Sequence, residues 1–255
     1  MSQALITLFD GEAGTGKSTI LAGFPQPRRV LDTDVDGWRW LKEHADKYES
    51  TRNLKEAGRI LSRWSEEKDG GSILIDTYSF GWEQVANQVM DDKERDPKFD
   101  THRAWGPAKR AVRVNLHFPI EIAKSNGIMV GLTAHTKPNI KREGGKVIDE
   151  GFKASSDSAV NRLLDLWFRI FKGPQTGIRW VEVVKCRPQE NWKPKIPERS
   201  KIEIGEYESH LLFGRIVDML GSLPESTKSN GGDEQAEDKD AQEAMRLASQ
   251  TYRKQ

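Results

Sequence analysis

The segment from Gly11 to Thr19 has the glycine spacing, the lysine and the hydroxyl group of a phosphate-binding loop. It matches the pattern G-x-x-x-x-G-K-[ST] at every fixed position. Glycines permit the turns that direct backbone N–H groups at phosphate oxygens. In such a loop Lys17 neutralises the β- and γ-phosphates, and the Ser18 hydroxyl ligates Mg²⁺. We therefore predict that ATP and Mg²⁺ bind to the residues Gly11, Glu12, Ala13, Gly14, Thr15, Gly16, Lys17, Ser18 and Thr19.

Carboxylates follow two other apolar runs, where they can serve the same nucleotide. Asp76 ends the run 72–76, as a carboxylate that supports Mg²⁺ opposite a phosphate loop does. It is followed by Thr77, so the base that activates water must come from elsewhere. We predict Asp34 as this base, with Asp32 as the alternative, since both follow the run 29–31 and share one face. Capping of the helix that follows is the structural alternative for these two carboxylates.

Apolar runs and helical patterns alternate along the chain, which indicates how these groups are positioned. The runs are continuously apolar and short, as in parallel strands buried on both faces. We predict an α/β fold with a mostly parallel central sheet and helices on both faces. The expected strands are 5–9, 29–31, 72–76, 128–133, 164–171 and 180–186, and the expected helices are 17–23, 38–48, 54–67, 80–91, 105–125 and 209–220.

The order of these features resembles the RecA-like P-loop ATPase core shared by RecA recombinases and DnaB-type helicases. A phosphate loop, an acidic strand end, the Asp76 strand and a strand ending in a polar sensor follow one another. The resemblance extends to small phage ATP-binding proteins that consist of this core alone, among them the ATPase branch of single-strand-annealing proteins. It covers about residues 4–190 and implies that His135 is the sensor of the γ-phosphate.

The same resemblance implies two further functions. In RecA-like proteins a mobile loop after the sensor contacts single-stranded DNA. Here residues 136–157 form a long, glycine-containing connection that we expect to be a flexible loop, with basic groups suited to a phosphate backbone. Lys185 and Arg187 end a strand on one face, where RecA-like ATPases place residues that reach the ATP of a neighbouring subunit. This implies a homo-oligomer. The predicted DNA-binding residues are Lys137, Lys141, Arg142, Lys146 and Lys153.

Composition sets the broad limits. The chain has 255 residues and a formal net charge of +1, so no overall electrostatic field attracts it to nucleic acid. It has a single cysteine, so no disulfide can form within the chain. Without a signal-peptide pattern or a membrane-length apolar run, we expect a cytoplasmic protein with no membrane partner. We expect an ATPase domain over residues 1–223 and a disordered acidic tail over 224–255, which offers a site for a protein partner.

These observations favour a DNA-stimulated ATPase of phage-type recombination or annealing. An assembly or partner-loading ATPase is the first alternative, with the acidic tail as the contact to the partner. A P-loop kinase acting on a small molecule is the second. It is less favoured, since residues 136–157 contain a single arginine and therefore lack an arginine-rich lid.

Overall fold

The computed structural model describes residues 4–34, 39–96, 98–143, 146–156, 158–172, 179–187 and 201–204; for residues 39–40, 138–143, 146–152 and 201–204 it describes the backbone alone. Strands and helices alternate through most of this length, as the sequence predicts. In chain order the elements are β1 (Ile6–Gly11), α1 (Lys17–Leu21), β2 (Arg28–Asp32), α2 (Arg39–Glu43), β3 (Lys47–Ser50), α3 (Leu54–Ser65), β4 (Ser72–Asp76), α4 (Ser79–Arg95), α5 (Thr101–Val112), the π-helix η1 (Arg113–His117), α6 (Phe118–Ser125), β5 (Met129–Glu143), β6 (Lys146–Ala154), α7 (Val160–Leu163), β7 (Leu166–Lys172), β8 (Arg179–Cys186) and β9 (Lys201–Ile204).

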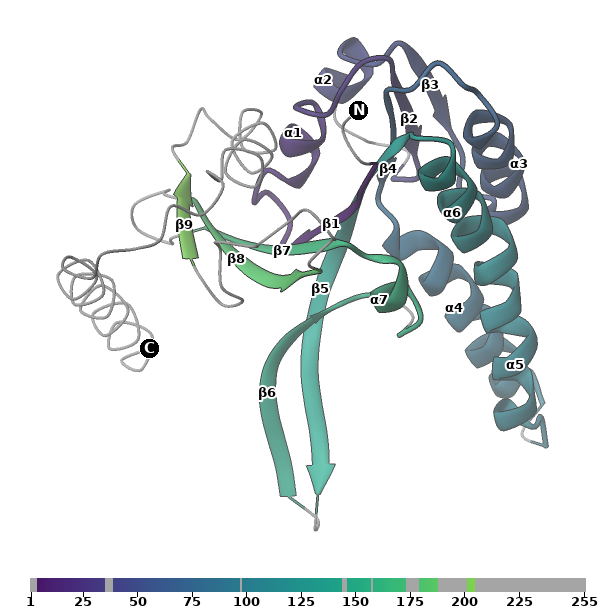
Figure 1. Ribbon diagram of the computed structural model, residues 1–255. Coiled ribbons are helices and arrows are strands. Elements are labelled where there is room, and N and C mark those ends of the chain that lie inside the picture. The colour runs from purple at the N-terminus through teal and green to yellow at the C-terminus, as the bar shows by residue number, and fades with distance from the viewer. Residues whose placement is uncertain are drawn as a thin grey trace, which may run out of the picture. The chain divides into compact units, whose positions relative to one another are not determined.

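The strands form one mixed sheet in the order β3-β2-β4-β5-β1-β7-β8-β9, with β6 paired to β5 alone (Figure 1). All pairs from β3 through to β7 are parallel. The pairs β7–β8, β8–β9 and β5–β6 are antiparallel. The predicted α/β class with a mostly parallel sheet is confirmed. Because parallel strands end at the same edge, the segments that follow β1, β2 and β4 emerge together.

Apolar side chains cover both faces of the sheet. In β1, Ile6 and Leu8 belong to one buried cluster with α3, η1 and α6, whereas Phe9, and Leu5 just before the strand, belong to a second cluster with α1, β7 and β8. This division follows from the alternation of side chains along a strand. Helix α3 begins at the cap Asn53, whose side chain accepts hydrogen bonds from two backbone N–H groups. The prediction of helices on both faces is confirmed.

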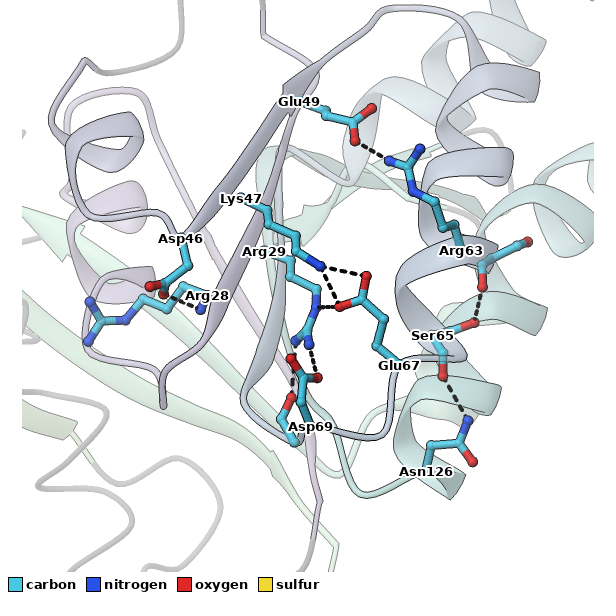
Figure 2. A network of polar contacts seen from close by, with 12 residues as sticks. Arg28, Arg29, Asp46, Lys47, Glu49, Arg63, Ser65, Glu67, Asp69 and Asn126 are labelled. Atoms are coloured by element: carbon cyan, nitrogen blue, oxygen red, sulfur yellow. Dashed lines mark hydrogen bonds and ion pairs between the residues drawn. The ribbon is translucent and has the colours of Figure 1, made fainter.

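The predicted helix 38–48 is wrong at its end, where the short strand β3 lies. Residues 47–50 pair in parallel with β2 at the sheet edge, and this tertiary pairing overrides a weak local helical pattern. Figure 2 shows the polar contacts that hold this edge. The Arg29 side chain is fully buried and donates to Glu67 (2.6 Å), to the carbonyl oxygen of Gly70 (3.0 Å) and to Asp69. Lys47 of β3 donates to the same Glu67 carboxylate.

The predicted flexible loop 136–157 is also wrong. β5 does not stop at residue 133 but continues to Glu143 and pairs antiparallel with β6, giving the long two-stranded ribbon of Figure 1. The Gly144-Gly145 pair between the strands is a hairpin signal that could have revealed this ribbon.

The predicted helix 105–125 begins earlier, at Thr101, and contains the π-helix η1. The cap residue Asp100 accepts a hydrogen bond from the Arg103 N–H at the start of this helix.

Two predictions lie outside the described residues, namely the helix 209–220 and the acidic tail. The short strand β9, which pairs with β8, was not predicted. No helix in the ranges given above is long and apolar enough to cross a membrane.

Candidate active site

The predicted nucleotide-binding groups meet at the carboxyl edge of the parallel strands. Gly11 at the end of β1 lies beside His135 of β5 in the sheet register. Asp32 at the end of β2 lies beside Asp76 at the end of β4. The phosphate loop, both acidic strand ends and His135 therefore lie at the same edge of the sheet, which is where α/β sheets bind ligands.

The loop after β1 has a conformation that requires glycine. Gly14 and Gly16 have φ angles of 74° and 91°, in the left-handed region that other residues rarely adopt. At Gly11 a Cβ atom would lie 2.6 Å from the carbonyl oxygen of Ile170, so any larger residue would displace the loop from β7. Lys17 donates hydrogen bonds to the carbonyl oxygens of Gly11 (2.8 Å) and Glu12 (2.7 Å). The ammonium group is thus held within the curve of the loop.

Burial and charge compete at Lys17. Burial lowers the pKa of this ammonium, while the carboxylates of Asp76 and Asp10 act in the opposite direction. Its side chain bonds to neutral carbonyl oxygens and lies close enough to these carboxylates, and to Asp34, to feel their charge. An anionic phosphate entering the loop would supply this partly desolvated cation with a direct counter-charge.

Asp76 and Ser18 offer oxygen ligands at the same place. Asp76 is buried and accepts a hydrogen bond from the Thr133 hydroxyl (2.5 Å), and the Ser18 hydroxyl lies beside it. Burial raises the pKa of Asp76, and the neighbouring Ser18 and Thr133 hydroxyl groups partly oppose the rise. Mg²⁺ prefers hard oxygen ligands, commonly one or two carboxylates together with phosphate and water. The paired hydroxyl and carboxylate fit such an ion.

The two candidate bases differ in how their oxygens are used. Asp32 is buried: its Oδ2 accepts the Tyr48 hydroxyl (2.5 Å) and its Oδ1 accepts the N–H of Asp34 (2.9 Å). Burial raises the pKa of Tyr48, as does its hydrogen bond to the Asp32 carboxylate. The side chain of Asp34 is 58% exposed and lies 3.7 Å from Arg52. Asp34 is therefore accessible to water, whereas both oxygens of Asp32 already accept hydrogen bonds.

His135 lies at the carboxyl edge with two residues of α4 that sequence reasoning missed. Its backbone N–H donates to the Ser79 hydroxyl (2.9 Å), and its Nδ1 lies 4.0 Å from the carboxylate of Glu83. Glu83 also accepts a hydrogen bond from the Ser155 hydroxyl, which anchors the segment after β6. The half-exposed imidazole therefore has fixed backbone support.

A buried ion pair beneath the phosphate loop was also missed. Asp10, fully buried in β1, accepts two hydrogen bonds from Arg169 of β7 at Oδ2 and one at Oδ1, at 2.8–3.2 Å. Burial raises the pKa of Asp10, and the Arg169 guanidinium opposes this rise. The sequence feature that could have indicated this ion pair is a charged residue inside each of two apolar strand runs, Asp10 in one and Arg169 in the other. The pair links β7 to the residue that precedes Gly11.

The five basic residues predicted to bind DNA all lie on the β5–β6 ribbon, defined as residues 136–154. Lys137 and Lys153 are paired at its base, and burial followed by repulsion from Lys153 lowers the pKa of Lys137. The backbone of the other three lies further along the ribbon, where Glu143 pairs with Lys146. The ribbon thus extends β5 directly beyond His135, at the carboxyl edge.

Lys185 and Arg187 lie at the opposite edge of the sheet. Cys186, between them, pairs with Leu166, which lies beside Thr7 near the start of β1. From Thr7 to the phosphate loop at Gly11 the strand rises about 13 Å at 3.3 Å per residue. The Arg187 guanidinium donates to the carbonyl oxygen of Arg162 at the end of α7 (2.7 Å). Neither side chain is placed to reach a nucleotide bound by its own phosphate loop.

Comparison with protein-family models gives no match, and comparison with curated protein sequences gives none. Among solved structures, the chain is similar to the crystal structure of the RadB recombinase. The TM-score is 0.44 and the sequence identity 13%, over 78% of this chain and 86% of that chain. A similarity at this level carries no conclusion about activity.

Proposed function

We propose that this chain is a RecA-like ATPase that binds ATP with Mg²⁺ and hydrolyses it. The observation that carries the proposal is the meeting of Lys17, Ser18 and Asp76 at one sheet edge, with the Ser18 hydroxyl beside the Asp76 carboxylate. Residues 11–19 would surround the phosphates, and Lys17 would neutralise them. Ser18 would ligate Mg²⁺, with Asp76 behind it. The ion, when bound, supplies electrostatic stabilisation of the transferring phosphoryl group.

Asp34 is the proposed base for the attacking water. Its exposed carboxylate feels the charge of Lys17, and its ion pair within the described residues is a surface contact with Arg52. Asp32 would instead act as a support, since it accepts the N–H of Asp34 and so fixes the turn after β2. His135 is proposed to sense the γ-phosphate, because its strand runs beside β1 and places His135 level with Gly11.

Single-stranded DNA is the proposed activator, in recombination or annealing of the phage type. The support comes from the β5–β6 ribbon, which carries Lys137, Lys141, Arg142, Lys146 and Lys153 and continues the strand of His135 without a break. A cationic ribbon suits a phosphate backbone. Because the ribbon and the proposed sensor share one strand, DNA on the ribbon can influence the geometry at the nucleotide.

A homo-oligomer follows if Lys185 and Arg187 act in hydrolysis. They lie at the far edge of the sheet from their own phosphate loop, so their contact with ATP would have to be made in a neighbouring subunit. A cation supplied in this way stabilises charge in the transition state.

The test is ATP turnover of the purified chain with and without single-stranded oligonucleotide. We expect Mg²⁺-dependent hydrolysis that rises with DNA and disappears in Lys17→Ala. Charge reversal at Lys141 and Arg142 should remove the stimulation but leave basal turnover, and should flatten the salt dependence of DNA binding by about 0.7 per lost phosphate contact. Reversal of Lys55, an exposed helix lysine far along the chain from the ribbon, is the matched control. Turnover that ignores DNA would reject this activator, and full turnover in Lys17→Ala would reject the site.

A further inference from the structure

A cavity of about 530 Å³ lies along α5, η1 and α6, lined by side chains that the proposed ATPase site does not use. Two adjacent rows of helix positions form its wall, since residues four apart lie on one helix face. We call this surface the α5–α6 groove and define it by Lys109, Arg110, Arg113, Val114, His117 and Phe118. A π-helical turn such as η1 often marks a functional site.

The groove has strong uncompensated positive charge. Lys109, Arg110 and Arg113 are exposed, and none of these three side chains forms an ion pair within the described part of the chain. The described residues that line the groove include no carboxylate. The Arg113 guanidinium lies 5.1 Å from the ring centre of Phe118, so it remains available for an anion while its plane is partly ordered.

The same surface is apolar at its other end. Four large apolar side chains are exposed in the described ranges, and three follow one helical row: Val114 (48% exposed), Phe118 (40%) and Ile122 (43%). Scattered exposed apolar residues are ordinary, but a row of them beside a cavity marks an interaction surface. The base of the groove is held in place by His117, which is buried and whose Nε2 is hydrogen-bonded to the Tyr78 hydroxyl at 2.6 Å.

We propose that the α5–α6 groove binds a short acidic peptide segment of a partner protein, with large apolar side chains beside its acidic residues. The carboxylates would pair with the three cations, and the apolar side chains would pack in the cavity against Phe118 and along the row to Ile122. Arginine clusters and apolar grooves are recurrent modes of peptide recognition. Single-stranded nucleic acid fits less well, because successive bases need successive planar side chains for stacking, and in the exposed row the neighbours of the Phe118 ring, Val114 and Ile122, are aliphatic.

The experiment measures binding of a fluorescein-labelled peptide by anisotropy, using the full chain. The probe has four alternating Asp and Glu residues followed by Leu-Leu-Phe-Leu; control peptides replace the acidic block by Ser or the apolar block by Ser. We expect saturable binding that needs both blocks. The double variant Arg110→Glu/Arg113→Glu should weaken it by at least about tenfold, and Phe118→Ala by about fivefold or more, which is the loss expected when a contributing interface side chain is truncated.

Matched variants separate the groove from general effects of charge and hydrophobicity. Lys55→Glu reverses an exposed helix lysine elsewhere, and Met90→Ala truncates the fourth exposed apolar side chain; both should bind like the unaltered chain. Equal weakening in these controls, or no saturable binding by the unaltered chain, would overturn the proposal. An oligo-dT strand that displaces the peptide and loses affinity in the same groove variants would also overturn it, in favour of nucleic acid. Basal ATP turnover is followed in parallel, so failure of the ATPase proposal is seen separately.

Discussion

The choice between the two acidic residues after β2 can be tested by single-atom changes. Asp34→Asn keeps the volume of the side chain but removes the charge that would accept a proton from water. The Asp34 carboxylate is exposed, and its contact with Arg52 is a surface pair at 3.7 Å. Such pairs contribute about 0–1 kcal/mol, so the variant should unfold within about 4 °C of the unaltered chain. Its loss should therefore appear in turnover and not in stability.

The expected loss of turnover follows from the role of a general base. Positioned bases contribute about 10²–10⁴ in rate, which corresponds to roughly 2.7–5.4 kcal/mol of activation free energy. We expect kcat of Asp34→Asn to fall by at least about 10² while ATP affinity stays the same, because the phosphates are held by residues 11–19. Single-turnover hydrolysis and fluorescent-nucleotide titration measure the two quantities independently.

Asp32→Asn should give the opposite pattern. This buried carboxylate accepts hydrogen bonds from the Tyr48 hydroxyl and the Asp34 N–H, and the amide can reproduce only part of that arrangement. Hydrogen bonds to charged groups contribute about 1.5–3 kcal/mol, so we expect the melting temperature to fall by roughly 3–12 °C. Tyr48→Phe, which removes the hydroxyl alone, should reproduce most of this loss. The reasoning would be refuted if Asp32→Asn were inactive yet fully stable while Asp34→Asn retained normal turnover.

Three further results are expected. Arg29→Met should lower the free energy of unfolding in urea by about 2–3 kcal/mol, because the buried Arg29 guanidinium has three partners. Arg63→Ala removes a surface arginine and should lower the same free energy by under about 1 kcal/mol. Similar losses in the two variants would contradict the importance of the Arg29 contacts in Figure 2. Burial raises the pKa of Asp76 in the folded chain. The folded state therefore loses stability relative to the unfolded state as pH rises through that pKa and the buried carboxyl ionises. Asp76→Asn should therefore lose Mg²⁺-dependent turnover yet melt higher than the nucleotide-free unaltered chain at neutral pH, with no gain below about pH 4, and a gain that is largest in acid would reverse this assignment. Arg187→Ala and Lys17→Ala should each be inactive alone but regain part of the activity when mixed; no recovery in proven mixed oligomers would remove the role of Arg187 across an interface.

The sequence by itself predicted the functional groups that can be recognised from a short stretch of chain. The spacing from Gly11 to Ser18 requires a particular backbone path, and a carboxylate at the end of the apolar run 72–76 is visible without a fold. Continuous apolar runs also identified the parallel strands, because a strand buried on both faces has little room for polar residues. These features depend on neighbours in the chain, so a pattern can reveal them.

Only the tertiary structure decided the features that depend on pairing between distant segments. The strand β3 forms because it pairs with the edge of β2, and this pairing brings the Tyr48 hydroxyl into a hydrogen bond with the Asp32 carboxylate. The Asp34 carboxylate, by contrast, stays accessible to water. The Asp10–Arg169 pair joins residues that are 159 positions apart. Strand direction likewise decided that Arg187 lies at the edge opposite the phosphate loop, since β8 runs antiparallel to β7. Sequence spacing fixes which chemical groups a strand carries, whereas hydrogen bonding between strands fixes which of those groups meet.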